Sequence, residues 1–193
     1  MASKMRFGFV AAVLAVGVFT LAACASAPPE TFDLSASIAR ARLRAPLAIR
    51  EPVASLDLDS QRILVRTGPD TVAYMAGAQW SDRLPALVQS RLVQTFQNAK
   101  QLRFVGRAGA GFSADYEMEI DIRAFELNVP RGQAVIDMAV KIVNARSGRV
   151  AAAQIFTAEA PASGTGSANA VTALNTALAS VMAKIAAFAS THE

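Results

Sequence analysis

The positions of apolar and polar residues divide the chain into segments with strand periodicity and segments with helical periodicity. Between residues 46 and 77, three short runs are rich in apolar and β-branched residues: PLAIREPVA, QRILVRTG and TVAYMAG. Turn-forming residues at 57–60 and in TGPD separate these runs, a pattern typical of short strands joined by tight turns. We therefore expect three strands here, and TFDL at 31–34 could add a fourth short one.

A helix is expected next, because the apolar spacing changes at Trp80. Apolar residues then recur every three or four positions, while Gln89 and the other polar residues fall elsewhere on the helical wheel. The apolar positions are Trp80, Leu84, Leu87, Val88, Leu92 and Phe96. Ser81 or Asp82 would cap this helix, and a cap at Asp82 places Pro85 in the first turn, where its missing N–H costs no bond. The pattern predicts a helix from about 82 to 98.

The middle of the chain predicts a β-meander. After a short strand at 102–105 and a glycine-rich loop at 106–111, apolar and charged residues alternate strictly from Asp115 to Arg123. Such alternation is typical of an antiparallel sheet with one face in water. The alternation slips at Ala124 and Phe125, where we expect a bulge. Turns at NVPRGQ and RSG then link this strand to AVIDMAVKIVNA and RVAAAQIFTAEA.

The last expected helix, about 168 to 190, has a continuous apolar stripe on one side. The stripe consists of Val171, Leu174, Leu178, Val181, Ile185 and Phe188. The opposite side is small and uncharged at Thr172, Thr176, Ala179 and Ala183, and Lys184 is the only charged residue in the helix. Small residues permit close approach of another backbone, so this side is a candidate contact face for a partner or a second copy. The alternative is that the alanines reflect composition alone.

The order of these segments predicts an α+β fold. Three strands, a helix, four strands and a last helix suit a mainly antiparallel sheet with two amphipathic helices packed on one face. No internal repeat of solenoid length is visible.

The N-terminus has the layout of a secretory signal peptide. Lys4 and Arg6 precede an uncharged, mostly apolar run at 7–23, and small residues lie just before Cys24. LAAC, ending at Cys24, resembles the lipobox of bacterial lipoproteins, in which the cysteine sulfur receives a diacylglycerol and becomes the new N-terminus. Cys24 is the only cysteine, so a disulfide within the chain is excluded. The alternative is a plainly secreted or membrane-anchored protein in which Cys24 is incidental.

These features predict a signal peptide at 1–23, a lipidated N-terminus and tether at 24–44, and a single domain at 45–190. A chain of about 170 mature residues suits one domain with an ample core. Loss of Lys4 and Arg6 with the signal peptide leaves 17 basic against 15 acidic residues, a net charge of +2. This small excess gives no reason to expect nucleic acid as a partner.

The sequence offers little for catalysis or cofactor binding. The sole histidine, His192, lies next to the C-terminal residue, so a nucleophile would lack a fixed general base. The glycine-rich stretches GRAGAG and SGTGS lack the Lys-Ser/Thr pair of a phosphate-binding P-loop. We therefore expect a protein that is not an enzyme and that carries no cofactor.

The acidic row Asp115, Glu117, Glu119 and Asp121 is expected to be a solvated sheet face. A hard cation is the alternative, but same-face neighbours on one strand stand nearly 7 Å apart, too far to share one ion unaided. Arg123 and Lys141 are the expected cross-strand partners, and we expect no metal site.

The junction at Trp80, Ser81 and Asp82 is a candidate partner contact, because it joins a strand to a helix and is expected beside the TGPD turn. The alternative for Trp80 is a core anchor, the usual role of an aromatic residue at the start of an amphipathic helix.

Taken together, the order of motifs resembles the ABC-type transport auxiliary lipoprotein family, which includes the paraquat-inducible protein C-type lipoproteins. The resemblance is carried by the lipobox, RILVR followed by AYMAGAQWSDRLP, ADYEMEIDIRAFE, IVNARSGRVAAAQIF and ANAVTALNTALASVMAKIA. Family members have a tyrosine-bearing strand soon after the anchor, where this chain has TFDL.

The resemblance implies a non-catalytic accessory component of an ABC transport system. The implied partners are a mammalian-cell-entry (MCE) domain protein and an ABC permease and ATPase, which move lipids between the inner and outer membranes. Ala25 is not the aspartate that favours inner-membrane retention, so the outer membrane, facing the periplasm, is the expected location. Two alternatives are a free-standing periplasmic lipid carrier or chaperone, and a structural envelope lipoprotein.

Overall fold

A computed structural model of the protein describes residues 27–39, 41–99 and 104–192. The predicted signal peptide and Cys24 lie outside the described residues. The elements, in chain order, are β1 (Glu30–Phe32), β2 (Leu47–Ile49), β3 (Val53–Ala54), β4 (Arg62–Arg66), β5 (Val72–Trp80), α1 (Leu84–Gln97), β6 (Val105–Arg107), β7 (Tyr116–Asn128), β8 (Gln133–Asn144), β9 (Val150–Pro161) and α2 (Ser167–His192). This element order confirms an α+β fold.

The strands form one mixed sheet, so the expectation of a mainly antiparallel sheet is wrong. Strands β7, β8 and β9 form the predicted antiparallel meander, and β4 pairs antiparallel with β5. However, β2, β3 and β4 each pair with β7 in parallel, β2 pairs in parallel with β6, and β1 pairs in parallel with β5. These parallel pairs join segments far apart in sequence, which local periodicity does not reveal.

Strand β7 lies at the centre of this arrangement. Its 13 residues pair with β8 on one side, and β2, β3 and β4 lie in succession along the other side. The register between β7 and β8 shifts between Ile122 and Ala124. This irregularity confirms the bulge that the slip in alternation predicts.

The expected run PLAIREPVA is divided into two short strands. Strand β2 ends at Ile49 and β3 begins at Val53, with Pro52 between them. Proline has no N–H to contribute to a ladder and is confined to strand ends, edges or bulges. The break lets β2 and β3 pair with different stretches of β7, at Tyr116–Met118 and Asp121–Ile122 respectively.

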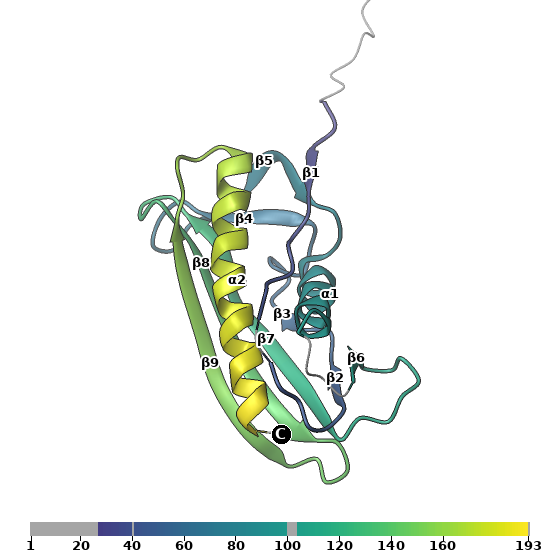
Figure 1. Ribbon diagram of the computed structural model, residues 1–193. Coiled ribbons are helices and arrows are strands. Elements are labelled where there is room, and N and C mark those ends of the chain that lie inside the picture. The colour runs from purple at the N-terminus through teal and green to yellow at the C-terminus, as the bar shows by residue number, and fades with distance from the viewer. Residues whose placement is uncertain (1–26, 40, 100–103, 193) are drawn as a thin grey trace, which may run out of the picture.

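Both helices lie on the same side of the sheet (Figure 1). Helix α2 packs on β7, β8 and β9 and also contacts α1, which packs near β6. The predicted apolar stripe of α2 is buried at all six positions, Val171, Leu174, Leu178, Val181, Ile185 and Phe188. Helix α2 is long and apolar enough to cross a membrane by composition alone, but this buried stripe identifies it as a core helix.

Helix α1 buries its predicted apolar stripe and one polar residue as well. Gln89, expected on the solvent side, is 6% exposed, and its amide Nε2 donates to the carbonyl of Ile49 at 2.9 Å. The glutamine therefore ties α1 to strand β2. A buried amide is tolerated here because it has a hydrogen-bond partner.

The segment before β2 is not a tether, so the predicted boundary at residue 44 is wrong. Residues 33–39 and 41–43 run between α1 and α2 (Figure 1), and the described odd-numbered residues from Ser37 to Leu43 are buried. The buried residues are Leu34, Ser37, Ala39, Ala41 and Leu43. Backbone N–H groups of this segment bond side chains of both helices: Ser35 to Asn175 on α2, Ser37 to Thr95 on α1 and Arg42 to Ser190 on α2. We call the described residues 33–39 and 41–43 the seam segment.

The seam segment explains part of the small-residue side of α2. The Ser37 hydroxyl donates to the carbonyl of Ala179 at 3.2 Å. Ala179 and Ala183 are half-buried, whereas Thr172 and Thr176 are exposed. Close approach of another backbone to the small residues of α2 therefore occurs within the chain at Ala179.

We predict that Thr95→Val destabilises the protein by about 1–3 kcal/mol, because it leaves the buried N–H of Ser37 without an acceptor. Thr95 is completely buried and its Oγ1 accepts from Ser37 N at 2.9 Å. Thr172→Val is the matched control, since the Thr172 hydroxyl bonds only the Ala168 carbonyl on the exposed side of α2. Denaturant unfolding should show a change within about 0.5 kcal/mol for the control. Equal stability of the two variants would contradict the assigned role of Thr95.

Candidate functional site

The junction between β5 and α1 is held by backbone hydrogen bonds to two other segments. The Trp80 N–H donates to the carbonyl of Gln61 at 2.7 Å, and the Ser81 N–H donates to that of Phe32 at 2.7 Å. The Leu84 N–H, at the start of α1, donates to the carbonyl of Ser60 at 3.0 Å. The junction is thereby fixed to the loop before β4 and to β1.

The residue that begins the helix differs from the predicted cap. Arg83, with φ −55° and ψ 134°, takes the N-cap position, and it makes no side-chain capping bond. Asp82 instead accepts a hydrogen bond from the Arg83 N–H at 2.7 Å. The Ser60 carbonyl satisfies the first helical N–H, so a side-chain cap is not needed there. Pro85 lies in the first turn, as predicted.

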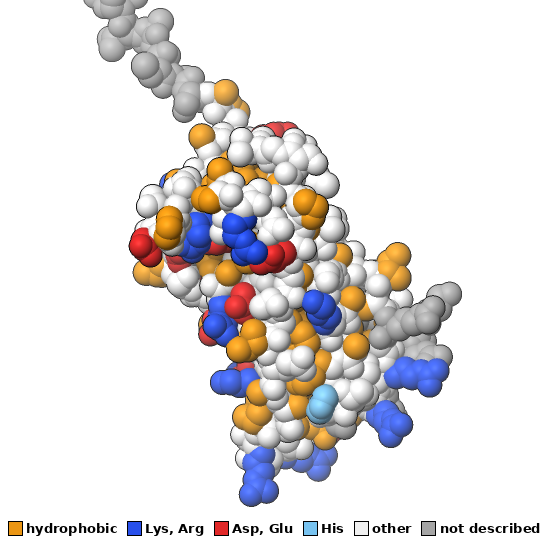
Figure 2. Space-filling view, turned by 90° about the vertical axis from the view of Figure 1, so that its left-hand side faces the viewer, with side chains coloured by type: hydrophobic (Ala, Val, Ile, Leu, Met, Phe, Trp, Pro, Cys, Tyr) orange, Lys and Arg blue, Asp and Glu red, His pale blue; other side chains and the backbone are white. Residues whose placement is uncertain are grey.

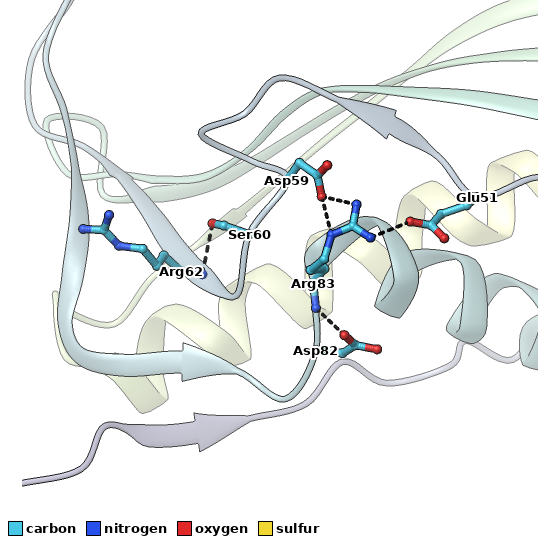
Figure 3. Close-up of polar contacts among 6 residues, drawn as sticks. All are labelled: Glu51, Asp59, Ser60, Arg62, Asp82 and Arg83. Carbon is cyan, nitrogen blue, oxygen red and sulfur yellow. Dashed lines mark hydrogen bonds and ion pairs between the residues drawn. The ribbon is translucent and has the colours of Figure 1, made fainter.

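Arg83 forms an ion cluster beside this junction (Figure 3). Its guanidinium Nε donates to Asp59 Oδ1 at 2.8 Å, and its Nη1 donates to Glu51 Oε1 at 3.1 Å. The hydrogen bond and the charge of Asp59 raise the pKa of Arg83, with a smaller contribution from Glu51. Arg83 therefore stays charged and links the β3–β4 loop, the β2–β3 connection and the start of α1.

Among the predicted contact residues at the junction, only Ser81 and Asp82 are available to a partner. Trp80 is 1% exposed and packs edge-on against Phe125, with ring centroids 5.9 Å apart and an interplanar angle of 84°. A partner contact at Trp80 is therefore wrong, and its alternative role as a core anchor is confirmed. Ser81 and Asp82 are exposed, so a contact there stays a prediction.

The TGPD turn does not lie beside the junction, contrary to expectation. The turn precedes Val72, at one end of β5, and the junction follows Trp80, at the other end. A nine-residue strand spans roughly 30 Å at about 3.3 Å per residue. The turn and the junction are therefore two separate surfaces.

The start of the seam segment lies between the junction and α2. Phe32 accepts from the Ser81 N–H, and Asp33 and Ser35 bond the side chain of Asn175 on α2. Thr172 lies about one turn before Asn175, and Thr176 directly follows it. The exposed candidate residues therefore gather around residues 32–35, near the first described residues of the chain.

The carboxylate of Asp33, at the start of the seam segment, forms an ion pair with Arg91. Arg91, on α1, donates a hydrogen bond to it, and this bond is the main cause of a lowered pKa of Asp33. Burial opposes the shift, while the N–H of Leu34 and the hydroxyl of Ser81 add to it. The ion pair joins the seam segment to α1.

The acidic row from Asp115 to Asp121 lies on the sheet face opposite the helices, and arginines pair with three of its four carboxylates. Arg50 lies 3.3 Å from Glu117 and 3.0 Å from Glu119, and Arg146 lies 3.5 Å from Asp115. Of the two partners expected from sequence, Lys141 is the cross-strand neighbour of Glu119, and Arg123 pairs with Asp137 at 3.9 Å. Sequence reasoning missed Arg50, because its approach depends on the parallel pairing of β2 with β7.

An open groove of about 540 Å³ lies on this opposite face, between the segment after β2 and the middle of β7 and β8. It is lined by both signs of charge, including Arg50, Glu51, Asp121 and Lys141, with Val53 and Ala139 as apolar residues. The groove has no buried titratable group and no nucleophile among its lining residues. Its chemistry suits weak polar contacts.

We predict that Asp33 contributes stability that is lost on acidification. Its folded-state pKa lies below the unfolded value of 3.8, so the contribution is complete above that value and disappears as the pH falls through the folded-state pKa. The side chain is 53% exposed, so the effect is a fraction of about 1 kcal/mol. Thermal melts of wild type and Asp33→Asn should differ at pH 7 and converge near pH 2. A constant difference across that range would rule out this assignment.

Comparisons with known proteins agree with the fold and identify the family. A crystal structure of a Xanthomonas campestris protein assigned to family DUF330 matches with a TM-score of 0.77 and 24% identity, covering 84% of this chain and 95% of that one. A hypothetical protein of Chlamydia trachomatis matches with a TM-score of 0.53 and 10% identity, covering 76% and 96%. At these identities the two structures show the fold alone.

Two sequence comparisons add to this. An uncharacterized protein of Bradyrhizobium diazoefficiens is 35% identical over 114 residues, which is 58% of this chain and 30% of that relative. The match therefore spans less than a third of the relative's length. The family model described as "ABC-type transport auxiliary lipoprotein component" matches residues 31–186. The chain belongs to the ABC-type transport auxiliary lipoprotein family.

Proposed function

We propose that this protein is a non-catalytic accessory subunit of an MCE-type ABC transport system that moves lipids between the inner and outer membranes. The observation that carries the proposal is the family match, which begins at Thr31 and continues to Ala186. It covers the seam segment, nearly all of the sheet and most of α2. In this proposal the ABC ATPase supplies the energy and an MCE-domain protein forms the lipid path.

The packed interior supports an accessory role over that of a lipid carrier. The space between the helices and the sheet is filled by large, fully buried side chains, including Trp80, Phe96, Phe125, Met118 and Leu92. Two grooves of about 540 and 590 Å³ lie at the surface, on the opposite sheet face and beside β9. A carrier needs an apolar space for an acyl chain, and this packing favours contact with partners at the surface.

The position of the single histidine supports a role without catalysis. His192 lies at the exposed end of α2, and its Nδ1 is within 2.9 Å of the Phe188 carbonyl of the same helix. A general base must be held against a nucleophile in a defined geometry. We propose that function depends on surface contacts and on position in the envelope.

The lipid anchor is the second part of the proposal. Cys24 precedes the first described residue by three positions, and β1 begins six residues after it. Because the seam segment is packed between α1 and α2, the free length between anchor and domain is much shorter than a tether to residue 44. The domain would therefore be held close to the membrane, and we propose the outer membrane.

We predict that Cys24→Ser prevents lipidation, so that the protein is released from the membrane or keeps its signal peptide. Metabolic labelling with a fatty acid should mark the wild type and leave the variant unlabelled. The folded domain should melt at the same temperature in both, since Cys24 lies before the seam segment. Labelling of the Cys24→Ser protein would contradict this prediction.

The exposed residues around the seam segment are the proposed contact with the transport system. We predict that a photo-crosslinking amino acid in place of Asp82 captures an MCE-domain protein or a permease in intact cells. The same amino acid at Asp70 is the matched control, because Asp70 is an exposed aspartate in the turn at the other end of β5. Capture of the same protein from both positions, or from Asp70 alone, would remove the junction as the contact.

Deletion of the gene tests the function as a whole. The deletion strain should have a weakened outer-membrane permeability barrier or an altered distribution of lipids between the membranes. Wild-type protein should restore the barrier, and the Cys24→Ser protein should restore it poorly because it loses its position. An unaltered lipid distribution, together with stoichiometric lipid in the purified protein, would favour the free-standing carrier instead.

A further inference from the structure

Strand β9 forms an open edge of the sheet. Among the described strands it pairs with β8 alone, and it is 12 residues long. Figure 1 shows it at the left border of the molecule, with α2 in front, and Figure 2 looks onto this border. A long edge strand presents a row of unpaired N–H and C=O groups to which another strand can bond.

The outward groups of β9 belong to its odd-numbered residues. Just past the strand, the Ala162 N–H donates to the Gly132 carbonyl on the β8 side at 2.9 Å, and the direction alternates from residue to residue. The Lys184 ammonium reaches the Thr157 carbonyl from the free side at 2.8 Å. The register between β8 and β9 shifts opposite Ile142 and Val143. On the C-terminal side of this shift, the residues whose backbone groups point away from β8 include Ala153, Ile155, Thr157 and Glu159.

The edge is apolar, which is unusual for a strand that stays unpaired. The nine residues from Val150 to Ala158 carry no charge, and Ile155 is 53% exposed. Natural edge strands are commonly protected by lysines or other charges on the strand itself. Here Lys184 approaches from α2, and hydrophobic side chains gather along the middle of this view of the molecule (Figure 2).

A groove of about 590 Å³ runs between this edge and the C-terminal half of α2. Its apolar lining includes Phe156 of β9 and Ala187 and Phe188 of α2, and the rings of Phe156 and Phe188 are in edge contact at 5.4 Å. A strand added to β9 would cover this groove and would also bond the unpaired backbone N–H and C=O groups of the edge.

We propose that β9 pairs antiparallel with β9 of a second copy of this chain, about a two-fold axis near Ile155, so that one sheet continues through both copies. The charges at the ends of the strand favour this occupant and direction. Arg149 directly precedes β9, and Glu159 lies near its end, where Arg131 of the same chain contacts it at 2.7 Å. Antiparallel pairing brings Arg149 of one copy toward the Glu159 carboxylate of the other. Parallel pairing would place like charges together.

The middle of β9 is also compatible with itself across such an axis. Residues 150–158 have no charge that would meet a copy of itself, and the outward alanine, isoleucine and threonine side chains suit a sheet. A two-fold interface uses the same patch on both copies, which requires this kind of self-complementarity. The paired edges would leave the junction at Ser81 and Asp82 accessible, so the two surfaces can act independently.

The test is cysteine crosslinking of the full chain in membranes. Ile155→Cys should give a disulfide-linked species of twice the monomer mass after mild oxidation, because the two thiols lie near the axis. Val53→Cys is the matched control: Val53 is 65% exposed and lies in the same cross-strand row through Asp121 and Ala139, but three strands from Ile155. At about 4.8 Å per strand it lies roughly 14 Å away, and it should give no linked species. The parent chain with Cys24 alone sets the background.

A charge variant provides the second measurement. Ile155→Lys should convert the detergent-solubilised protein from two copies to one while its far-UV circular dichroism stays that of the folded protein, whereas Val53→Lys should change neither the copy number nor the spectrum. Lys184→Met should raise the crosslinking yield of Ile155→Cys, because Lys184 competes for the Thr157 carbonyl. Absence of a linked dimer from Ile155→Cys, equal yields from Val53→Cys, or a linked product containing a different protein would each overturn the proposal.

Discussion

Hydrogen bonding on both sides of β7 is the constraint on which the rest of the fold depends. One side of this strand bonds β8 from end to end, and the other side is shared by the short strands β2, β3 and β4. Three short parallel strands have few ladder bonds each, so β7 provides their common template. The bulge after Ile122 determines which side chains of the C-terminal part of β7 face the core. Phe125 is one of them, and it contacts Trp80.

The placement of Trp80 links this sheet to the helices. Strand β5, which ends at Trp80, reaches β7 only through β4, and α1 begins four residues later at Leu84. Loop backbone groups at Ser60 and Gln61 bond Leu84 and Trp80 respectively, so the start of α1 is fixed by the chain that enters β4. The ion cluster of Arg83 with Asp59 and Glu51 surrounds these backbone bonds with charge at the surface.

Local pattern was sufficient for the elements that have a strong period. The apolar stripe of α2, the meander from β7 to β9 and the bulge near Ala124 follow from spacing alone, because one face of each element must be buried. The parallel pairs were not predictable, since the contacts of β2 with β7 join residues almost 70 positions apart. The same reason applies to Arg50, whose glutamate partners are brought to it by that pairing.

The seam segment was misread for a different reason. The sequence at 33–43 is small and polar enough to resemble a linker, but Leu34, Ala39 and Leu43 fit the narrow space between α1 and α2, and α2 is rich in small residues. Burial there depends on α1 and α2, which lie far along the chain. Of the candidate contacts, sequence located the exposed pair Ser81 and Asp82 correctly at the strand-to-helix junction, but it could not separate them from the buried Trp80.

The proposed accessory role rests on a filled interior, a short connection to the expected lipid anchor and candidate contacts near the first described residues. The most direct measurement is affinity purification of the full-length, lipid-anchored protein from detergent-solubilised membranes, followed by mass spectrometry of the proteins and lipids that accompany it. The account predicts an MCE-domain protein and an ABC permease and ATPase, with lipid no greater than in a control lipoprotein. Recovery of stoichiometric lipid without any transport component would contradict it.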